Sequence, residues 1–269
     1  MNLLIEMFAY DFMLRALVVG VAIALVAALI GVPLVLRRSS MIGDGLSHAA
    51  FGACALALAV GVMPTIPALI IVLLASFLIL QISRNRKIYS DALIAILSVS
   101  SLAIGVLAIS LAGGINIDLN SYLFGSILSV GYEDVAISLI LALIVVILYI
   151  VLFKKIFAVT FDAEFAKSID IKVNLYDAIF AAICSVVVVI GMKLLGALLV
   201  SGLIIFPALI AMRLVKTFRG VVVAASVISI VGFLLGLILS YVLALPTGAT
   251  IVAVDLIFLL LAIILDRCC

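Results

Sequence analysis

The stretch ALVVGVAIALVAALIGVPLVL (residues 16–36) runs for 21 residues without a charge and is followed directly by Arg37 and Arg38. A helix of this length spans about 30 Å, the thickness of the hydrocarbon core of a bilayer. The same character extends over the whole chain of 269 residues, which is 69% hydrophobic and 10% charged, with a mean hydropathy of +1.63. Soluble proteins are about 45 to 50% apolar and about 25% charged. The sequence therefore predicts an all-α protein that crosses a membrane several times.

Further apolar runs, each bounded by charged or turn residues, predict about nine crossings. Eight is the alternative, because several runs are short and the break around Lys193 is shallow. The runs occupy residues 16–36, 45–62, 66–80, 92–112, 135–153, 175–192, 194–212, 221–245 and 250–265. Between the fourth and fifth runs, residues 122–130 are half apolar and predict a short re-entrant or interfacial helix. Because little chain remains outside the membrane, residues 1–269 are expected to form a single transmembrane domain.

The basic residues lie mainly on one side of this arrangement. The loops after the odd-numbered runs and the C-terminal tail contain 13 of the 15 Lys and Arg residues, and only Arg15 and Lys193 fall on the other side. Since cytoplasmic loops are enriched in Lys and Arg, we expect a multi-pass protein of the cytoplasmic (inner) membrane with its N-terminus outside and its C-terminus in the cytoplasm. A net charge of +2 is too small to indicate a nucleic-acid partner.

Two ionisable residues, Asp44 and His48, lie four apart in GDGLSHAA at the start of the second run. On a helix this spacing places both side chains on one face. A carboxylate and an imidazole together suit zinc, manganese or iron, so the pair predicts a metal contact. In the alternative interpretation, Asp44 caps the helix and His48 bonds a neighbouring carbonyl. Ionisable groups at membrane depth cost about 2.5 to 3.5 kcal/mol each, which favours a functional role.

Three further acids adjoin or interrupt the apolar runs. Asp255, in IVAVDLIFLL, lies inside a run and could face the same pathway, or pair with a backbone donor or a cation of a neighbouring helix. Asp91 and Asp177 lie at the ends of runs and are expected to be solvated groups at helix termini.

Small residues in GALLVSGLIIFP (residues 196–207) indicate a helix that another backbone can approach closely. Such a face suits close helix packing, and it could also line a pathway. The candidates for either role are Gly196, Ser201, Gly202 and Pro207, together with Ser47 of the second run.

The longest polar stretch, residues 154–174, is predicted to be a cytoplasmic loop. Within it, Asp162 can cap a short helix over residues 162–169, and Phe161, Phe165 and Ile169 recur every four residues. A short amphipathic helix of this kind could lie on lipid headgroups or dock a cytoplasmic subunit.

The sequence contains no GxxxxGK[ST] phosphate loop, no HExxH, no CxxC and no GxSxG. We therefore expect a transport subunit and not an enzyme, with any ATP hydrolysis supplied by another chain. A secondary transporter of small metabolites or cations, driven by an ion gradient, is the main alternative, although inverted repeats and coupling-ion acids are not evident. An intramembrane enzyme using Asp44 and His48 as an acid–base pair is a further one, but no nucleophile accompanies them.

Six motifs, in order, resemble those of the permease subunit of zinc, manganese and iron ABC importers. They are LRRSSMIGDGLSHAAFG (36–52), DAL (91–93), IDLNSYLFGSIL (117–128), FDAEFAKSIDI (161–171), KLLGALLVSGLIIFPALIA (193–211) and LPTGAT (245–250). The resemblance covers nearly the whole chain. It departs from the family pattern at Gly45, where Ala is usual, and at Gly52-Ala53, where a Pro-Gly pair is common.

The resemblance implies a type II ABC importer permease: a homodimer with the ion pathway along its axis, driven through alternating access. It also implies two kinds of partner, a cytoplasmic ABC ATPase subunit and an extracellular or periplasmic metal-binding protein. The zinc, manganese or iron ion is cargo, and no permanently bound cofactor is implied.

The family motifs assign roles to particular residues. The GDxxSH motif maps onto residues 43–48, which implies metal contact for Asp44 and His48. The coupling helix maps onto residues 161–171. Contact with the ATPase is thereby implied for Phe161, Asp162, Glu164 and Phe165.

Overall fold

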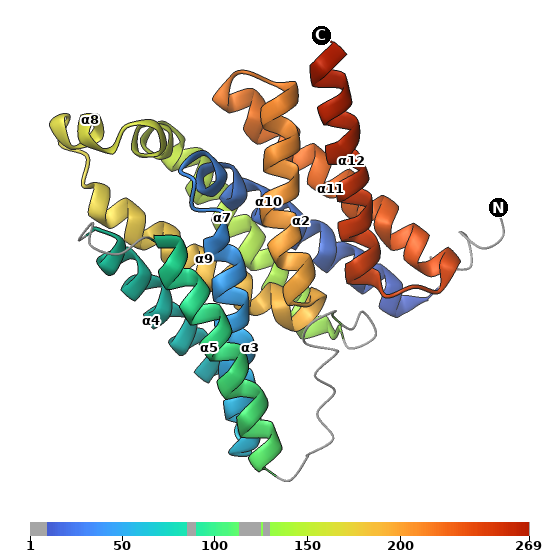
Figure 1. Cartoon of the computed structure of the whole chain (residues 1–269). Helices are drawn as coiled ribbons and strands as arrows, with labels where there is room; N and C mark the ends of the chain where they lie inside the picture. Colours follow the sequence, from blue (N-terminus) through green and yellow to red (C-terminus); the bar gives the residue numbers. More distant parts are fainter. Residues whose placement is uncertain (1–9, 85–89, 113–124, 126–129, 269) are drawn as a thin grey trace.

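The computed structural model describes residues 10–84, 90–112, 125 and 130–268, and within these residues every regular element is a helix (Figure 1). The helices are α2 (Asp11–Leu36), α3 (Met41–Ala59), α4 (Thr65–Arg84), α5 (Ser90–Leu111), α7 (Tyr132–Phe161), α8 (Ala163–Ser168), α9 (Val173–Leu195), α10 (Ala197–Leu214), α11 (Phe218–Leu243) and α12 (Thr247–Cys268).

Each of the nine predicted apolar runs corresponds to one of these helices. In the described part of the chain, eight helices are long and apolar enough to cross a membrane; the described apolar part of α4, Thr65–Ile79, falls short of that length. The all-α membrane fold is confirmed. By length and composition, the described helices agree with the lower of the two predicted numbers of crossings. The predicted short helix at residues 122–130 lies outside the described residues, apart from Gly125 and Val130.

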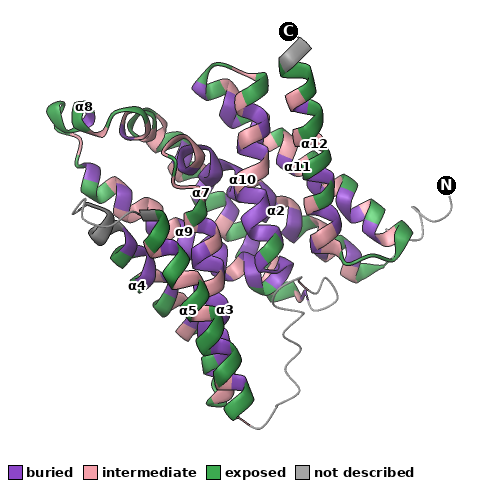
Figure 2. Cartoon of the chain, viewed as in Figure 1, coloured by how far each residue is buried: buried purple, intermediate pink, exposed green. Residues whose placement is uncertain are grey.

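The first apolar run forms the centre of the bundle. In α2, 78% of the membrane-spanning stretch is buried, against 17% in α5, and α2 packs against α7, α9, α10 and α11 (Figure 2). Small residues make this possible, because Gly20 lies against the ring of Phe233 in α11 and Gly31 lies against the backbone of Ile204 in α10. A side chain at either glycine would push the neighbouring helix away.

Glycine also brings α3 and α5 together into a close helix pair (Figure 1). A Cβ at Gly45 would lie 2.5 Å from Ile94 Cγ2, and one at Gly52 would meet the backbone carbonyl of Ser101. Gly105 approaches Gly52 from the α5 side. The two departures from the family pattern, Gly45 and Gly52, are therefore points of close contact, and α3 remains one continuous helix from Met41 to Ala59.

The boundary between α9 and α10 lies at Gly196, a few residues beyond the break expected at Lys193. Gly196 has φ of 90° and ψ of 154°, a conformation that glycine adopts much more readily than other residues. Lys193 stays helical and pairs with Asp134 of α7 at 3.0 Å. The break predicted around Lys193 is therefore present, but it lies a few residues further on, because the charge of Lys193 is placed in an ion pair and does not interrupt the helix.

Ion pairs between helices agree with the predicted separation of the two faces. Lys193, which was assigned to the less basic face, pairs with Asp134 of α7, and Arg213, which was assigned to the basic face, lies 3.1 Å from Asp266 of α12. Each pair joins helix ends that the crossing pattern places on the same side.

Candidate metal-contact site and coupling segment

Asp44 and His48 lie on the first turns of α3, as their spacing predicts. The Asp44 Oδ2 to His48 Nε2 distance is 3.8 Å, and their side chains are 37% and 29% exposed. The imidazole Nδ1 is buried and has no hydrogen-bond partner among the described residues. The structure therefore does not have the alternative in which this nitrogen bonds a neighbouring carbonyl. The other nitrogen, Nε2, faces the Asp44 carboxylate.

The pair lies on the one open side of this end of α3. Successive helical residues are about 100° apart, so Gly43 and Ser47 form a stripe that contacts α10, and Gly45 begins the stripe that contacts α5. Asp44 and His48 lie between these two stripes. The residues of the two packed stripes, Gly43 with Ser47 and Gly45, are buried, whereas Asp44 and His48 between them are only partly buried.

Ser47 and Ser201 join α3 to α10 directly beside the pair. The Ser47 hydroxyl donates to the Gly43 carbonyl at 2.8 Å, and Ser201 Oγ lies 3.3 Å from Ser47 Oγ and 3.1 Å from the Ala197 carbonyl. Both serines are buried. The two serines thus mark the place where α3 meets α10, next to Asp44 and His48.

The remaining candidates in α10 lie in close helix contacts. A Cβ at Gly202 would lie 2.9 Å from Val252 Cγ2 of α12, so this glycine permits the approach of α10 to α12. Pro207 lies inside α10 and is buried. These positions accord with helix packing, the first of the two roles expected for them.

Asp255 lies elsewhere, in the contact between α11 and α12. Its side chain is fully buried, and neither carboxylate oxygen has a hydrogen-bond partner among the described residues. One oxygen lies where a Cβ on Gly232 would be, and Phe258 is close by. Neither the backbone donor nor the neighbouring cation expected for it is found in the described chain, and in this conformation it is sealed from solvent.

A divalent ion would find two protein ligands at Asp44 and His48 in one copy of the chain. No group of three or more His, Cys, Asp or Glu side chains that could hold a metal forms within the described ranges. Since zinc takes four ligands, the set offered by one chain is incomplete and must be extended by water or by another chain.

The predicted amphipathic segment forms α8, between the ends of α7 and α9 at the edge of the bundle (Figure 1). Asp162 caps it as predicted, with Oδ1 accepting from the backbone N–H groups of Glu164 at 3.0 Å and Phe165 at 2.9 Å. Phe161 and Phe165 are 59% and 57% exposed. Ala166, on the inner side, is fully buried, so α8 is held to the bundle by one face and presents Phe165 outward. Phe161 is the last residue of α7, and its ring centroid lies 4.9 Å from that of Phe157 and 5.9 Å from that of Phe218.

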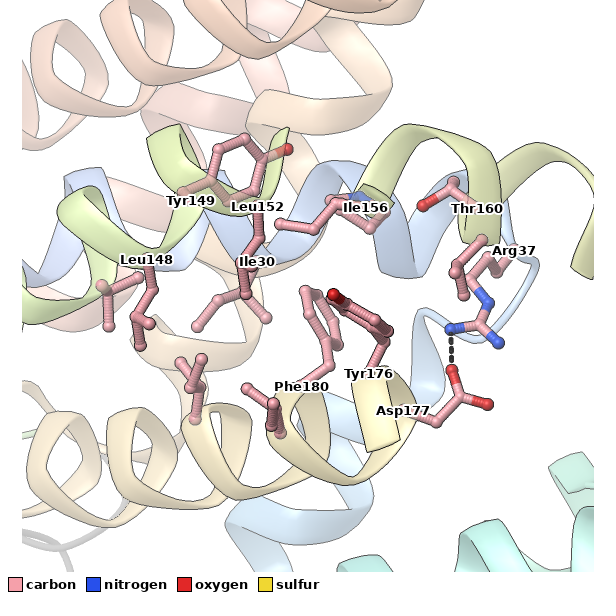
Figure 3. Close-up of a pocket in the computed structure, with 15 residues that line it drawn as sticks. Ile30, Arg37, Leu148, Tyr149, Leu152, Ile156, Thr160, Tyr176, Asp177 and Phe180 are labelled. Atoms are coloured by element: carbon pink, nitrogen blue, oxygen red, sulfur yellow. Dashed lines mark hydrogen bonds and ion pairs between the residues drawn. The ribbon is translucent and has the colours of Figure 1, made fainter. Parts of the chain in front are cut away.

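Asp177 was expected to be a solvated helix end, and that prediction was wrong. The residue is only 7% exposed, and its Oδ1 lies 2.7 Å from Nη1 of Arg37, at the end of α2 (Figure 3). The sequence holds no signal for this pair, because its members are 140 residues apart. It lies at one end of a groove between α2, α7 and α9 that is lined by apolar side chains such as Leu152 and Phe180.

Comparison with known proteins assigns the chain to one family. A model of the ABC 3 transport family matches residues 9–266. The chain is 31% identical over 253 residues to the manganese import system permease protein ScaB of Streptococcus parasanguinis, covering 94% of this chain and 90% of that protein. It is 28% identical over 243 residues to the high-affinity zinc uptake system membrane protein ZnuB of Haemophilus influenzae, covering 90% and 93%.

A solved structure gives the same result for the fold. The structure of PsaBC from Streptococcus pneumoniae in complex with Fab matches with a TM-score of 0.85 and 29% identity, covering 97% of this chain and 94% of that one. The similarity thus extends over nearly the whole length of both chains. The chain belongs to the ABC 3 transport family, and the resemblance to metal-importer permeases expected from its motifs is confirmed.

Proposed function

We propose that this chain is the permease subunit of an ATP-driven importer of divalent transition-metal ions, with Asp44 and His48 as the residues that contact the ion. The observation that carries the proposal is the arrangement of this pair: Nε2 of His48 and Oδ2 of Asp44 lie 3.8 Å apart on the partly open side of α3, so an ion placed there would meet both. Imidazole and carboxylate ligands suit manganese, zinc and ferrous iron.

Two copies of the chain would complete the ion site. A two-fold axis beside the open side of α3 brings two Asp44 carboxylates and two His48 imidazoles together, giving four protein ligands. The exposed position of the pair in a single chain supports this arrangement, because ligands at a two-fold interface are uncovered until the second copy is present.

The outer face of α8 is the proposed contact for a cytoplasmic ABC ATPase subunit. Phe165 on α8 presents an exposed aromatic ring beside the charged Glu164, and the exposed ring of Phe161 lies at the end of α7 just before it; exposed aromatic and charged residues together are typical of anchors at protein interfaces. ATP binding and hydrolysis in that subunit would move α8 and drive alternating access. We further propose that the N-terminus is outside, where an extracellular or periplasmic metal-binding protein delivers the ion, and that the C-terminus is cytoplasmic.

Reconstitution tests the proposal. The full chain, assembled in vesicles with a candidate ATPase and metal-binding protein, should take up manganese, zinc or ferrous iron only with hydrolysable ATP. Competition among the three ions identifies the cargo. Uptake that needs no ATP and follows a proton or sodium gradient would overturn the proposal in favour of a secondary transporter.

The docking role of α8 has its own test. Phe165→Ala should lower the amount of ATPase that co-purifies with the permease by about tenfold or more, since truncating a central aromatic anchor costs about 2 kcal/mol. Leu143→Ala, which truncates a similarly exposed side chain in the middle of α7, serves as the control. If α8 lies on lipid headgroups instead, co-purification will be the same for both variants.

A further inference from the structure

The ion pair between Arg37 and Asp177 joins the end of α2 to the beginning of α9 (Figure 3). At 2.7 Å it is a direct hydrogen-bonded contact, and the side chain of Asp177 is only 9% exposed. Because one partner is shielded from water, the attraction between the two charges is stronger than in a fully solvated pair. The pair also lies between the two parts of the proposed machinery, α8 and the Asp44–His48 site.

On one side of the pair, α8 and the start of α9 behave as one packed unit. Ala166 of α8 is fully buried against Val159 of α7 and Val173 of α9. The Ile171 N–H donates to the Ala166 carbonyl at 3.0 Å, which closes the short connection between α8 and α9. These contacts connect α8 to the first turns of α9, where Asp177 lies.

On the other side, the turn from Arg37 into α3 is held by backbone hydrogen bonds. The N–H groups of Arg38 and Ser39 donate to the carbonyls of Val35 at 3.0 Å and Leu34 at 2.8 Å. Ile42 then donates to the Ser39 carbonyl at 3.1 Å, at the first turn of α3. Arg38 has φ of 56°, a left-handed conformation that few non-glycine residues adopt, so the direction of this turn is fixed.

We propose that Arg37 and Asp177 are positioning residues that pass the movement of α8 to the start of α3, and so set the position of Asp44. The inference rests on the proposed function and adds to it the route by which the ATPase reaches the ion site. The route is contiguous: α8 to α9 by packing, α9 to α2 by the ion pair, and α2 to α3 by the hydrogen-bonded turn. Asp44 follows that turn by two residues.

A second ion pair at a helix end provides a matched control. Arg213 of α10 and Asp266 of α12 are 3.1 Å apart, but their side chains are 43% and 47% exposed and neither helix adjoins α8. An exposed pair of this kind contributes little to stability. Removing it should leave transport unchanged, whereas removing the Arg37–Asp177 pair should not.

The experiment uses the reconstituted transporter with its ATPase and measures three quantities: ATP hydrolysis, ion uptake per ATP, and manganese binding to the purified permease. Arg37→Gln and Asp177→Asn should each lower uptake per ATP by about 3- to 30-fold, the usual range for residues that carry coupling, with manganese binding retained. Arg37→Asp combined with Asp177→Arg should recover uptake, because the pair is rebuilt with its charges exchanged. Arg213→Gln with Asp266→Asn should match the unaltered protein.

The inference fails if the single variants transport as well as the unaltered chain, or if the exchanged pair is no better than the worse single variant. If Arg37→Gln folds poorly, Arg37→Lys replaces it, because that variant keeps the charge. Uptake per ATP at the unaltered level in Arg37→Lys, together with lowered uptake in Asp177→Asn, supports the role of the ion pair. A chain that takes up no metal at all before any substitution overturns the proposed function itself, which is a different result.

Discussion

Two regions of the molecule place acidic groups within apolar helices, and these groups differ in how far they are exposed. At the start of α3, Asp44 and His48 are 37% and 29% exposed and face one another across 3.8 Å. In the contact of α11 with α12, Asp255 is fully buried against Gly232, with no hydrogen-bond partner in the described chain. The sequence alone makes both regions candidates for the ion pathway, but only the first is open to an ion in this conformation.

The neighbouring glycines explain the difference. In α3, Gly43 and Gly45 lie on the two stripes beside the pair, so α10 and α5 come close on either side and leave the pair uncovered between them. In α11, Gly232 lies directly opposite Asp255 and makes the space that the carboxylate fills. In α3 the glycines lie beside the ionisable pair and leave it partly open, whereas in α11 the glycine lies opposite the acid and the acid is enclosed.

The largest effect is expected at the open pair. Asp44→Asn combined with His48→Ala removes both protein ligands, and metal uptake in proteoliposomes should fall by more than about 100-fold, since even the loss of supporting residues around a metal costs about 10- to 100-fold. Glu133→Gln, which neutralises an exposed acid in the first turn of α7, should take up metal at the unaltered rate. Equal metal uptake by the Asp44 and His48 double variant and by Glu133→Gln would show that the open pair is not the ion site, and the contrast with Asp255 would then carry no functional meaning.

A smaller effect, on stability and not on the ion site, is expected at the enclosed acid. Gly232→Ala places a methyl group where Asp255 Oδ1 lies, and overpacking of this kind costs about 1 to 3 kcal/mol. The melting temperature of the purified protein should fall accordingly. Combining this change with Asp255→Ala should recover part of the loss, because the shorter side chain leaves room for the methyl group; additive losses would show that the two residues do not meet.

The smallest effect is expected for Asp255→Asn. The carboxylate accepts no hydrogen bond from the described residues, so the amide, which has nearly the same shape, loses none. Uptake of metal should stay within about twofold of the unaltered chain. A loss comparable to that of the Asp44 and His48 variant would place Asp255 in the pathway after all.

The membrane fold could be predicted from the sequence because its signal is local. Apolar runs, their length and the charges that bound them indicate helices such as α2 without knowledge of the neighbours. The same holds for Asp162, whose capping role depends only on the residues that follow it. The spacing of Asp44 and His48 likewise places them on one helical face.

The features that could not be predicted depend on distant residues or on backbone conformation. The partner of Asp177 is Arg37, 140 residues away, and no local pattern indicates it. Lys193 looks like a break in an apolar run until Asp134 of α7 is known to pair with it, and the true break is set by the backbone conformation of Gly196. The enclosure of Asp255 similarly requires the position of α11.

X-ray absorption spectroscopy of the purified, metal-loaded permease tests the central claim most directly. We expect imidazole nitrogen in the coordination shell of bound manganese or zinc in the unaltered chain and in Asp255→Asn, and its absence in His48→Ala, since His48 is the only histidine of the chain. An imidazole signal that persists in His48→Ala, or one that is lost in Asp255→Asn, would contradict the assignment of the ion site to the open side of α3.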